Sequence, residues 1–396
     1  LLGPSPAMMF TCNWTALLCT LLSILSVCIA DVPETSHDVI IIGGGPSGLS
    51  AASGLSRVLR KSVLFDSGEY RNNPTRHMHD VIGNDHVVPA EFRKTAREQI
   101  AFYNSTTFID EKVTKLEKVG DNIFQATFGD QQFTARKVIL ASGMKDNLPD
   151  VPGLEDGFGK GIYWCPWCDG FEHRNQSMGV LGNLSDAYGA VRELHPTLNK
   201  DIRIYANGTN TTEQIAILDE KHPNWRKVFQ TYNVTVNNKP ILNITRIQDG
   251  GVVYDPATRR EFDKFQIYFV DNSFEVRGAF LTNYDTSQRS DLPAQLGVEM
   301  LGSKMNTLRK GLRTSVPGVW GVGDANSDNS TNVPHAMSSG KSAAVYCHVE
   351  MAQEELDRDA GLEKRETEFD EASFHEATEQ QMGSEIHDLY KRLSRR

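Results

Sequence analysis

The chain has 396 residues, of which 39% are hydrophobic, and its formal net charge is −10. The length predicts two domains, and the hydrophobic content supports a packed globular enzyme. Nucleic acids and anionic membrane surfaces attract proteins through basic patches, so the acidic balance argues against both as partners.

The first thirty residues differ from the rest. Residues 15–30 read TALLCTLLSILSVCIA, an apolar run that is short for a full membrane span. Cys28 and Ala30 fit the −3 and −1 positions of a secretory cleavage site, although no Lys or Arg precedes Arg57. We interpret residues 1–30 as a signal peptide, and the alternative is an uncleaved anchor.

Sequons of the form Asn-x-Ser/Thr are dense along the chain. A single sequon means little, but this density favours a secreted, extracellular and N-glycosylated protein. Six of the nine fall between Asn175 and Asn243. The nine begin at Asn13, Asn104, Asn175, Asn183, Asn207, Asn210, Asn233, Asn243 and Asn329.

Residues 37–55, HDVIIIGGGPSGLSAASGL, predict a buried strand, a glycine turn and a helix of small residues. Gly43, Gly45 and Gly48 form G-x-G-x-x-G between strand and helix, and Asp66 ends the next strand. The first glycine permits the tight turn, the second lets a pyrophosphate approach the backbone, and the third lets the helix lie close to the sheet. The phosphate then meets the helix N-terminus. This context predicts a dinucleotide site.

Residues 70–81, YRNNPTRHMHDV, are predicted to form a loop. His77 and His79 are spaced like a metal pair, but no acid or cysteine around them completes a site. We therefore expect a loop over the cofactor or the substrate rather than a metal site. Residues 105–140 alternate in short strands and predict a β-meander inserted into a doubly wound domain.

Residues 163–170, YWCPWCDG, place Cys165 and Cys168 three positions apart. Without residues 1–30 the chain keeps only these two and Cys347, which is too few for a disulfide framework. The pair must therefore be explained as chemistry. Cys347 lies in a helical pattern and is interpreted as a buried small hydrophobe.

Near the end of the chain, residues 316–325, VPGVWGVGDA, predict another buried strand that closes on Gly323 and Asp324. From Glu350 to Arg396 the chain is highly charged and prone to form helix. We interpret that part as a peripheral helix or a partly ordered tail without chemistry.

Four motifs, DVIIIGGGPSG, VILASG, WCPWCDG and VWGVGDA, occur in this order and resemble the low-molecular-weight thioredoxin reductase family over residues 37–350. The resemblance implies an α/β fold with two Rossmann-like doubly wound domains. An FAD domain with a β-meander would comprise residues 31–150 and 281–350. An inserted domain, 151–280, would carry the CxxC pair, and 351–396 would be a charged helical extension.

The resemblance also implies which residues bind the cofactor, FAD. In the family the first glycine motif holds FAD and the late Gly-Asp pair contacts the flavin ribityl chain. The implied FAD-binding residues are Gly43, Gly45, Pro46, Ser47, Gly48, Asp66, Ser142, Gly143, Gly323, Asp324 and Ala336.

The chain departs from the family at the second nucleotide turn. After the CxxC the family has another G-x-G-x-x-A/G for NADPH, but here Gly182 is followed by Asn183 and Leu184. The Leu184 side chain is expected to occupy the pyrophosphate space, and Asn183 is also a sequon. Residues 204–220 contain no basic residue for a 2′-phosphate, and no acid ends the strand for an NAD ribose. We predict that the second nucleotide pocket is lost.

A protein with a flavin and a dithiol but no NADPH site needs another electron source. We therefore predict that thiols reduce the flavin and that molecular oxygen reoxidises it. The sequence resembles the secreted fungal FAD-dependent sulfhydryl oxidases, which turn two thiols and oxygen into a disulfide and hydrogen peroxide. We expect a small thiol such as glutathione, or protein thiols, as the substrate, and the resemblance implies a homodimer. The open alternatives are an NADPH-dependent thioredoxin-type disulfide reductase, a dithiol oxidase of epidithio toxin biosynthesis, and a binding protein that keeps FAD only as structure.

The resemblance assigns roles around the CxxC. Cys165 is expected to exchange with substrate through a mixed disulfide, and Cys168 to face the flavin. A helix beginning at the pair would stabilise thiolate and lower the thiol pKa. Asp169 is the first choice for moving the proton, and Glu172 and His173 are the runners-up.

For three further side chains we consider two interpretations of their role. For Trp164 we favour packing over stacking on a substrate, and for Trp167 the two are even. His335 follows the late Gly-Asp pair where a helix is expected to point at the flavin. It could add a proton or a positive charge there, or be an ordinary histidine of the first helical turn.

Overall fold

The computed structural model describes residues 35–307, 311–328 and 331–362. The predicted signal peptide, the sequons at Asn13 and Asn329 and most of the charged C-terminal extension lie outside these ranges. All elements below belong to one compact unit, Ser36–Arg396. Among its described residues, none of the helices has the length and apolar character of a membrane span.

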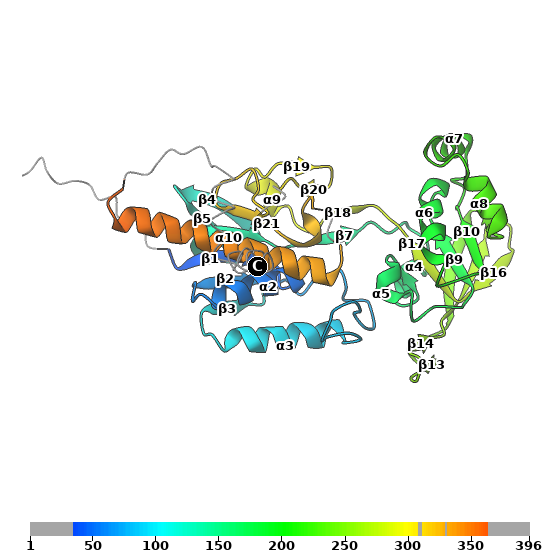
Figure 1. Ribbon diagram of the computed structural model, residues 1–396, viewed down its shortest axis with the longest axis horizontal. Coiled ribbons are helices and arrows are strands. Elements are labelled where there is room, and N and C mark those ends of the chain that lie inside the picture. Colours follow the sequence, from blue (N-terminus) through cyan, green and yellow to red (C-terminus); the bar gives the residue numbers. More distant parts are fainter. Residues whose placement is uncertain (1–34, 308–310, 329–330, 363–396) are drawn as a thin grey trace, which may run out of the picture. The chain divides into compact units, whose positions relative to one another are not determined.

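The first sheet is doubly wound and carries the glycine motif (Figure 1). Its strand order is β3-β2-β1-β6-β5-β4, and β21 pairs with β6. Strands β1, β2, β3, β6 and β21 pair in parallel, whereas β4, β5 and β6 form an antiparallel meander. The strands are β1 (His37–Ile42), β2 (Ser62–Phe65), β3 (Thr106–Ile109), β4 (Lys115–Gly120), β5 (Ile123–Phe128), β6 (Gln131–Leu140) and β21 (Val319–Gly321).

The meander predicted for residues 105–140 is confirmed for β4, β5 and β6. Strand β3 is different, because it pairs in parallel with β2 and so extends the doubly wound part of the sheet. Its four residues alternate weakly in burial, and sequence pattern alone does not separate a parallel edge strand from a meander strand.

Helices α2 (Pro46–Ser56), α3 (Pro89–Ala101) and α10 (Val333–Asp359) belong to this first domain. Helix α10 lies against α2 at glycines, since a Cβ on Gly340 would stand 2.0 Å from the backbone oxygen of Ser47. Helix α10 also crosses the expected boundary at residue 350. Beyond that point Glu354 binds the buried ammonium of Lys137 at 2.5 Å, so the helix stays tied to the sheet up to this turn.

The second sheet confirms the second Rossmann-like domain. Its order is β11-β10-β9-β17-β8 and all of its pairings are parallel. A three-stranded antiparallel sheet, β12-β15-β16, and a β13-β14 ladder accompany it. The elements are α4 (Leu154–Gly157), β8 (Ile162–Tyr163), α5 (Pro166–Asp169), β9 (Met178–Leu181), α6 (Leu184–Leu194), β10 (Ile202–Tyr205), α7 (Thr212–Lys221), α8 (Trp225–Thr231), β11 (Thr235–Asn237), β12 (Ile241–Gln248), β13 (Tyr254–Asp255), β14 (Arg260–Glu261), β15 (Lys264–Phe269), β16 (Phe274–Arg277) and β17 (Ala279–Thr282).

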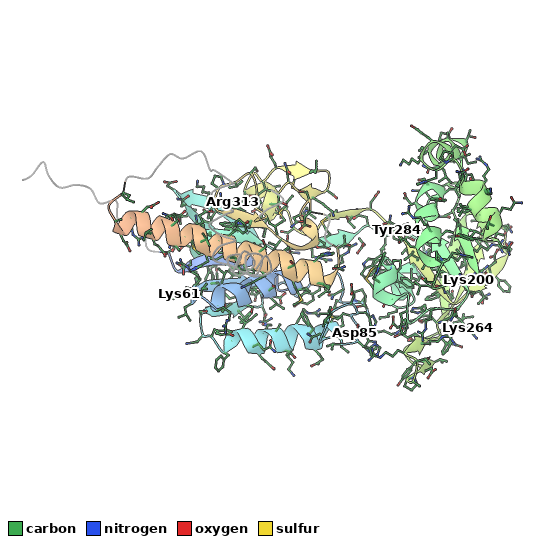
Figure 2. All side chains as sticks on the ribbon, viewed as in Figure 1. Lys61, Asp85, Lys200, Lys264, Tyr284 and Arg313 are labelled. Carbon is green, nitrogen blue, oxygen red and sulfur yellow. A yellow bond between two sulfur atoms is a disulfide. The ribbon has the colours of Figure 1, made fainter. Side chains whose placement is uncertain are left out.

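Two short strands join the halves of the chain. The chain leaves the first sheet through β7 (Met144–Asp146) and returns through β18 (Thr286–Gln288), and the two pair antiparallel. Tyr284, labelled in Figure 2, lies on the returning segment. After it come α9 (Leu292–Gln295), β19 (Met300–Leu301), β20 (Lys304–Met305) and the 3-10 turn η1 (Gly323–Ala325).

Candidate active site

The glycine turn between β1 and α2 has the shape that a dinucleotide pyrophosphate requires. Gly43 has a φ of 114°, and a Cβ there would lie 2.3 Å from the backbone oxygen of Ala141. A Cβ on Gly48 would lie 1.9 Å from the backbone oxygen of Gly43, so α2 can approach the turn only with glycine at this position. A Cβ on Gly45 would meet nothing within 4 Å. The open side of Gly45 is therefore where a phosphate can reach the backbone.

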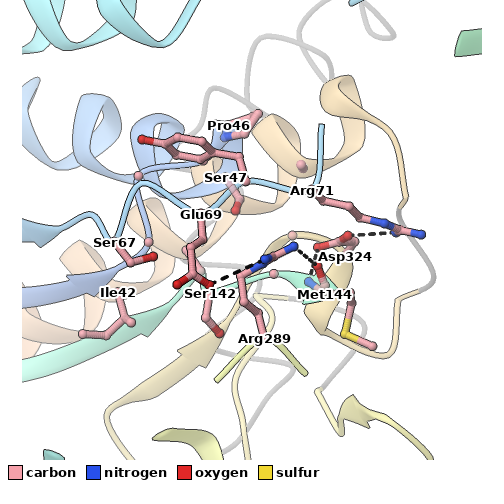
Figure 3. A pocket seen from close by; sticks show the side chains of 18 of the residues that line it. Ile42, Pro46, Ser47, Ser67, Glu69, Arg71, Ser142, Met144, Arg289 and Asp324 are labelled. Carbon is pink, nitrogen blue, oxygen red and sulfur yellow. Dashed lines mark hydrogen bonds and ion pairs between the residues drawn. The ribbon is translucent and has the colours of Figure 1, made fainter. Parts of the chain in front are cut away.

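One pocket that opens to solvent collects most of the predicted cofactor residues (Figure 3). Gly48 is the exception, because it packs behind the turn. The predicted residues that line the pocket are Gly43, Gly45, Pro46, Ser47, Asp66, Ser142, Gly143, Gly323, Asp324 and Ala336.

Asp66 ends β2 at the edge of this pocket and is almost fully buried. Its carboxylate accepts hydrogen bonds from the Tyr70 hydroxyl at 2.6 Å and from the Gly68 N–H at 3.0 Å. Burial and the bond to Asp66 raise the pKa of Tyr70 to about 12, so the hydroxyl remains a donor. The carboxylate is thus held in one orientation at the place where this fold receives a ribose.

The far wall of the pocket is built around Asp324 (Figure 3). One carboxylate oxygen accepts from the Met144 N–H at 3.2 Å, and the other accepts from Arg71 at 3.0 Å. Arg71 also binds Asp146 at 2.6 Å, so one guanidinium holds both acids. The Ser142 hydroxyl is buried on this wall without a hydrogen-bond partner. An orphaned buried hydroxyl fits a polar atom of a bound cofactor.

Helix α10 begins at the same pocket. Asn332 caps the helix by accepting the backbone N–H of His335 at 3.0 Å, and Ala336 lines the pocket. The Gly323 N–H donates to Ser339 Oγ at 2.9 Å, which fixes the preceding turn. The His335 residue is exposed and does not line the pocket. The structure therefore does not bring His335 to the other predicted residues, and its position matches the second reading, a histidine of the first helical turn.

Cys165 and Cys168 form a disulfide, with their Cα atoms 5.2 Å apart. Cys165 is the N-cap of α5, and the Cys168 N–H donates to the Cys165 carbonyl at 3.0 Å. Helix α5 is a single turn of four residues, so it offers a weaker dipole to a thiolate than the sequence suggested. The predicted burial of Cys347 is confirmed, and burial raises the pKa of its thiol to about 12.

Asp169 follows Cys168 and lies next to a network of charged side chains. Burial raises the pKa of Asp169 to about 7, although the neighbouring His173 acts in the opposite direction. His173 faces two acceptors, since Nδ1 donates to the Asp169 carbonyl at 2.9 Å and Nε2 to Asp263 at 3.1 Å. Burial alone would lower the pKa of His173, but the bond to Asp263 makes the net shift upward. The His173 side chain therefore joins the Asp169 carbonyl of α5 to the Asp263 carboxylate.

The two tryptophans beside the cysteines have different surroundings. Trp164 lines the cofactor pocket and stacks on Phe158 with ring centres 4.9 Å apart. The Arg71 guanidinium lies 5.7 Å from the Trp164 ring centre. Trp167 is 67% exposed beside the disulfide. The packing reading thus fits Trp164, while Trp167 remains free to meet a substrate.

At the second nucleotide turn, between β9 and α6, side chains bind one another and the start of the helix. A Cβ on Gly182 would meet nothing within 4 Å. Asn183 caps α6 by accepting the Asp186 N–H at 2.9 Å and the Ser185 hydroxyl at 2.8 Å. Its amide nitrogen donates to the Asp186 carboxylate at 2.7 Å, so a glycan on this nitrogen would disturb the cap. The predicted position of Leu184 is wrong. Its side chain is buried in the hydrophobic core of the domain, because the first turn of α6 directs it inward, and does not fill the pyrophosphate space.

Part of the loop after β2 lines the cofactor pocket, as expected, at Tyr70, Arg71 and Asn72. No acid near His77 and His79 in sequence is spaced to complete a metal site, but the fold brings a carboxylate from another segment close to His79. The Glu172 carboxylate lies 3.4 Å from His79 Nε2, and His86 Nδ1 lies 3.0 Å from the same atom. His79 Nδ1 donates to the Cys168 carbonyl at 2.5 Å. The loop therefore contacts the CxxC directly.

Arg71 and Arg76 are the site residues that sequence reasoning missed. Arg76 binds Asp249, Glu261 and Asp263 at 2.5 to 2.9 Å, which ties its loop to the second domain. Both arginines lie in the segment YRNNPTRHMHDV that was expected to cover the cofactor or the substrate. Two arginines in a loop expected to cover the cofactor or the substrate were a signal for a role at the site. Their carboxylate partners could not be predicted, because these lie far away in sequence.

Comparison with known proteins agrees with this geometry. Residues 37–183 match the family model described as pyridine nucleotide-disulphide oxidoreductase. The probable thioredoxin reductase of Arthroderma benhamiae is 50% identical over 347 residues, which cover 85% of each chain. This chain belongs to the thioredoxin reductase-like flavoproteins. It is a flavin-dependent disulfide oxidoreductase whose cofactor is FAD, and the glycine turn and the pocket described above fit that cofactor.

Further relatives of this flavoprotein agree. Thioredoxin reductase aclD of Aspergillus oryzae is 34% identical over 329 residues, covering 80% of this chain and 97% of the relative. The crystal structure of HlmI matches with a TM-score of 0.70 and 26% identity, covering 82% and 95% of the two chains. Thioredoxin reductase from Streptococcus pyogenes matches with a TM-score of 0.66 at 21% identity, covering 80% and 98%, and supports the fold alone.

Proposed function

We propose that this flavoprotein oxidises thiols, with electrons entering through the Cys165–Cys168 disulfide and leaving to molecular oxygen. Two thiols and one O₂ give one disulfide and one H₂O₂. The observation that carries the proposal is the cap between β9 and α6, where the Asn183 side chain accepts the Asp186 N–H that a pyrophosphate would otherwise meet. The absence of a basic residue from 204 to 220 supports it, because a 2′-phosphate needs a cation.

The first step that we propose is thiol exchange at the disulfide, with Cys165 as the outer sulfur by resemblance to the family. A substrate thiolate attacks Cys165 Sγ, which breaks the bond to Cys168 and leaves a thiolate there. A second substrate thiolate then attacks the substrate sulfur of this mixed disulfide, so the product disulfide leaves and Cys165 becomes a thiolate. FAD, held by pocket residues such as Gly45, Ser142 and Asp324, would supply the two-electron acceptor for the reduced cysteine pair and the route to oxygen.

Asp169 is suited to hold the proton that accompanies this exchange. Because burial raises its pKa to about 7, it is neutral in part of the molecules and charged in the rest near neutral pH. A group with such a pKa can both give and take a proton. It follows Cys168 directly in the chain, so we assign it the proton of that thiol.

Oxygen uptake tests the proposal. The holoprotein with glutathione, dithiothreitol or a dithiol peptide should consume oxygen and form equal amounts of peroxide. Cys168→Ser should lose this activity while keeping its flavin. Cys347→Ala is the matched control, because its thiol is buried in α10, and it should keep the activity. No peroxide from any thiol would refute the proposal, and uptake that survives in Cys168→Ser would place the chemistry elsewhere.

A second candidate is a thioredoxin-type disulfide reductase fed by NADPH. The names of the relatives in Arthroderma benhamiae and Aspergillus oryzae favour it. It predicts NADPH consumption when the holoprotein meets an oxidised dithiol protein, followed by nicotinamide absorbance. Steady consumption there, together with no oxygen uptake from thiols, would select this candidate over the first.

We further propose that the enzyme works outside the cell and carries N-linked glycans. The sequon residues Asn104, Asn175, Asn207 and Asn233 are exposed and have positive φ angles, which places them on turns open to solvent. Enzymatic deglycosylation of the protein secreted by its native host should lower its mass. An unchanged mass would contradict this part of the proposal.

A further inference from the structure

A cluster of three side chains lies beside the disulfide and is not used by thiol exchange. His79 and His86 come from the loop between β2 and α3, and Glu172 comes from the segment after α5. We propose that His79, His86 and Glu172 bind one divalent transition-metal ion, with zinc as the first choice. This inference does not depend on the oxidase or the reductase reading.

The distances suit one shared ion. His79 Nε2 lies 3.0 Å from His86 Nδ1 and 3.4 Å from the Glu172 carboxylate, and the three ligand atoms lie within 4.8 Å of one another. With bonds of about 2.1 Å, the ligand atoms of a tetrahedral zinc ion stand roughly 3.4 Å apart. Two imidazoles and a carboxylate are ligands that zinc accepts.

The hydrogen positions point the same way. A carbonyl oxygen only accepts, so the contact at 2.5 Å between His79 Nδ1 and the Cys168 carbonyl places a hydrogen on Nδ1. The ring nitrogen Nε2 faces the carboxylate of Glu172, which is almost fully buried, at 3.4 Å. A metal ion is one of the cations that these two atoms can share. The bond from the other ring nitrogen to a backbone carbonyl is also the usual support of a metal-bound histidine.

The loop holds His86 in a conformation that needs other support. His86 has a φ of 64°, which is uncommon for a residue with a side chain. An antiparallel bridge between Met78 and Val87 and the ion pair of Asp85 with Arg259 at 3.0 Å fix the loop around it. Such strain is found where the surrounding structure imposes it, often at ligand sites.

The His77 ring stacks on His86 with centres 3.9 Å apart, but it lies outside the group of three ligands. His77 therefore provides a matched control with the same side chain in the same loop. Three protein ligands also leave a fourth position open for water or for a thiolate. A bound ion would join the loop of the first domain to the segment that follows the CxxC.

Zinc binding to the holoprotein tests the proposal. The protein is stripped with a chelator, kept oxidised so that Cys165 and Cys168 stay paired, and titrated with zinc in a calorimeter. We expect one ion per chain, with affinity at least about tenfold weaker in His86→Asn and in Glu172→Gln. His77→Asn should bind zinc like the wild type. Flavin content and thermal midpoint show that each variant is folded.

Cobalt(II) provides an independent readout, because tetrahedral coordination gives a strong visible absorption that octahedral cobalt lacks. The wild type and His77→Asn should show this band, and His86→Asn should not. A wild type that binds no metal would mean that an ordinary hydrogen bond joins the two histidines, and would overturn the proposal. Equal zinc affinity in wild type, His86→Asn and Glu172→Gln would overturn it as well, by placing the ion elsewhere.

Discussion

The turn after β1 and the turn after β9 both join a parallel strand to a helix, in two sheets of the same kind. In the first turn Gly45 caps α2 without a side chain, and the helix N-terminus opens into the cofactor pocket. In the second turn Asn183 caps α6 with its own carboxamide and binds Asp186. The same backbone topology therefore gives a helix start without a side-chain cap in one place and a capped helix start in the other.

The comparison teaches that a Rossmann-like sheet does not by itself make a nucleotide site. Phosphate needs both a close approach to the backbone and unpaired N–H groups. The first turn provides the approach at Gly43 and Gly45, where side chains are absent. The second turn keeps Gly182, but the Asn183 side chain accepts one N–H of the helix N-terminus. In sequence the Cys165–Cys168 disulfide lies between the two turns, and we propose it as the entry for electrons.

The largest expected effect comes from the first turn. Gly48→Val would place a side chain against the backbone oxygen of Gly43, where even a Cβ stands at 1.9 Å. We expect the protein to be purified without flavin and without activity, as measured by flavin absorbance. Ala187→Gly is the corresponding change in the second turn, and it should keep full flavin. Flavin retained in Gly48→Val would remove the difference between the two turns.

Asp169→Asn tests whether the proton, like the electrons, passes through the CxxC segment. Because the pKa of Asp169 is about 7, thiol turnover in the wild type should change across neutral pH. The variant should lose that limb of the pH profile and turn over about 10- to 100-fold more slowly. An unchanged profile would remove Asp169 from the reaction.

Asp169 also affects stability, and the sign follows from its raised pKa. Between about pH 4 and pH 7 the unfolded state releases the proton while the folded state keeps it. Stability should therefore fall as the pH rises through this window. Asp169→Asn should lack this slope, which urea unfolding at several pH values would show.

Leu184→Ala tests what the leucine of the second turn does. Since Leu184 is buried in the core of its domain, the change should lower the free energy of unfolding by about 2–5 kcal/mol. It should not create NADPH binding, because the N-terminus of α6 remains capped. Urea unfolding and a nucleotide titration measure the two effects. NADPH binding gained by this variant would restore the view that Leu184 fills the pyrophosphate space.

The smallest effect is expected for Asn183→Ala. Loss of the N-cap should cost about 1 kcal/mol of stability, and Asn183→Asp, which can still cap, should cost less. Thiol oxidation should stay near the wild-type rate in both variants. A large loss of thiol turnover in Asn183→Ala would mean that the second turn takes part in the reaction.

Local motifs made much of this site predictable. Gly43 and Asp66 lie next to the strands that position them, so their places follow from neighbours in sequence. The contacts of Arg71 with Asp324 and of His79 with Glu172 could not be read, because 253 and 93 residues separate the partners. The prediction for Leu184 was wrong for another reason. Its place within the first helical turn decides whether the side chain points outward or into the core, and the sequence pattern does not show this.

The most direct test of the central claim is the reduction of the flavin without oxygen. One sample of holoprotein receives NADPH and a second receives a dithiol, and the flavin absorbance is followed in both. If electrons enter through the disulfide and not from NADPH, the dithiol should bleach the flavin and NADPH should leave it oxidised. Cys168→Ser should prevent bleaching by the dithiol. Rapid bleaching by NADPH would contradict the proposal that the second nucleotide pocket is lost.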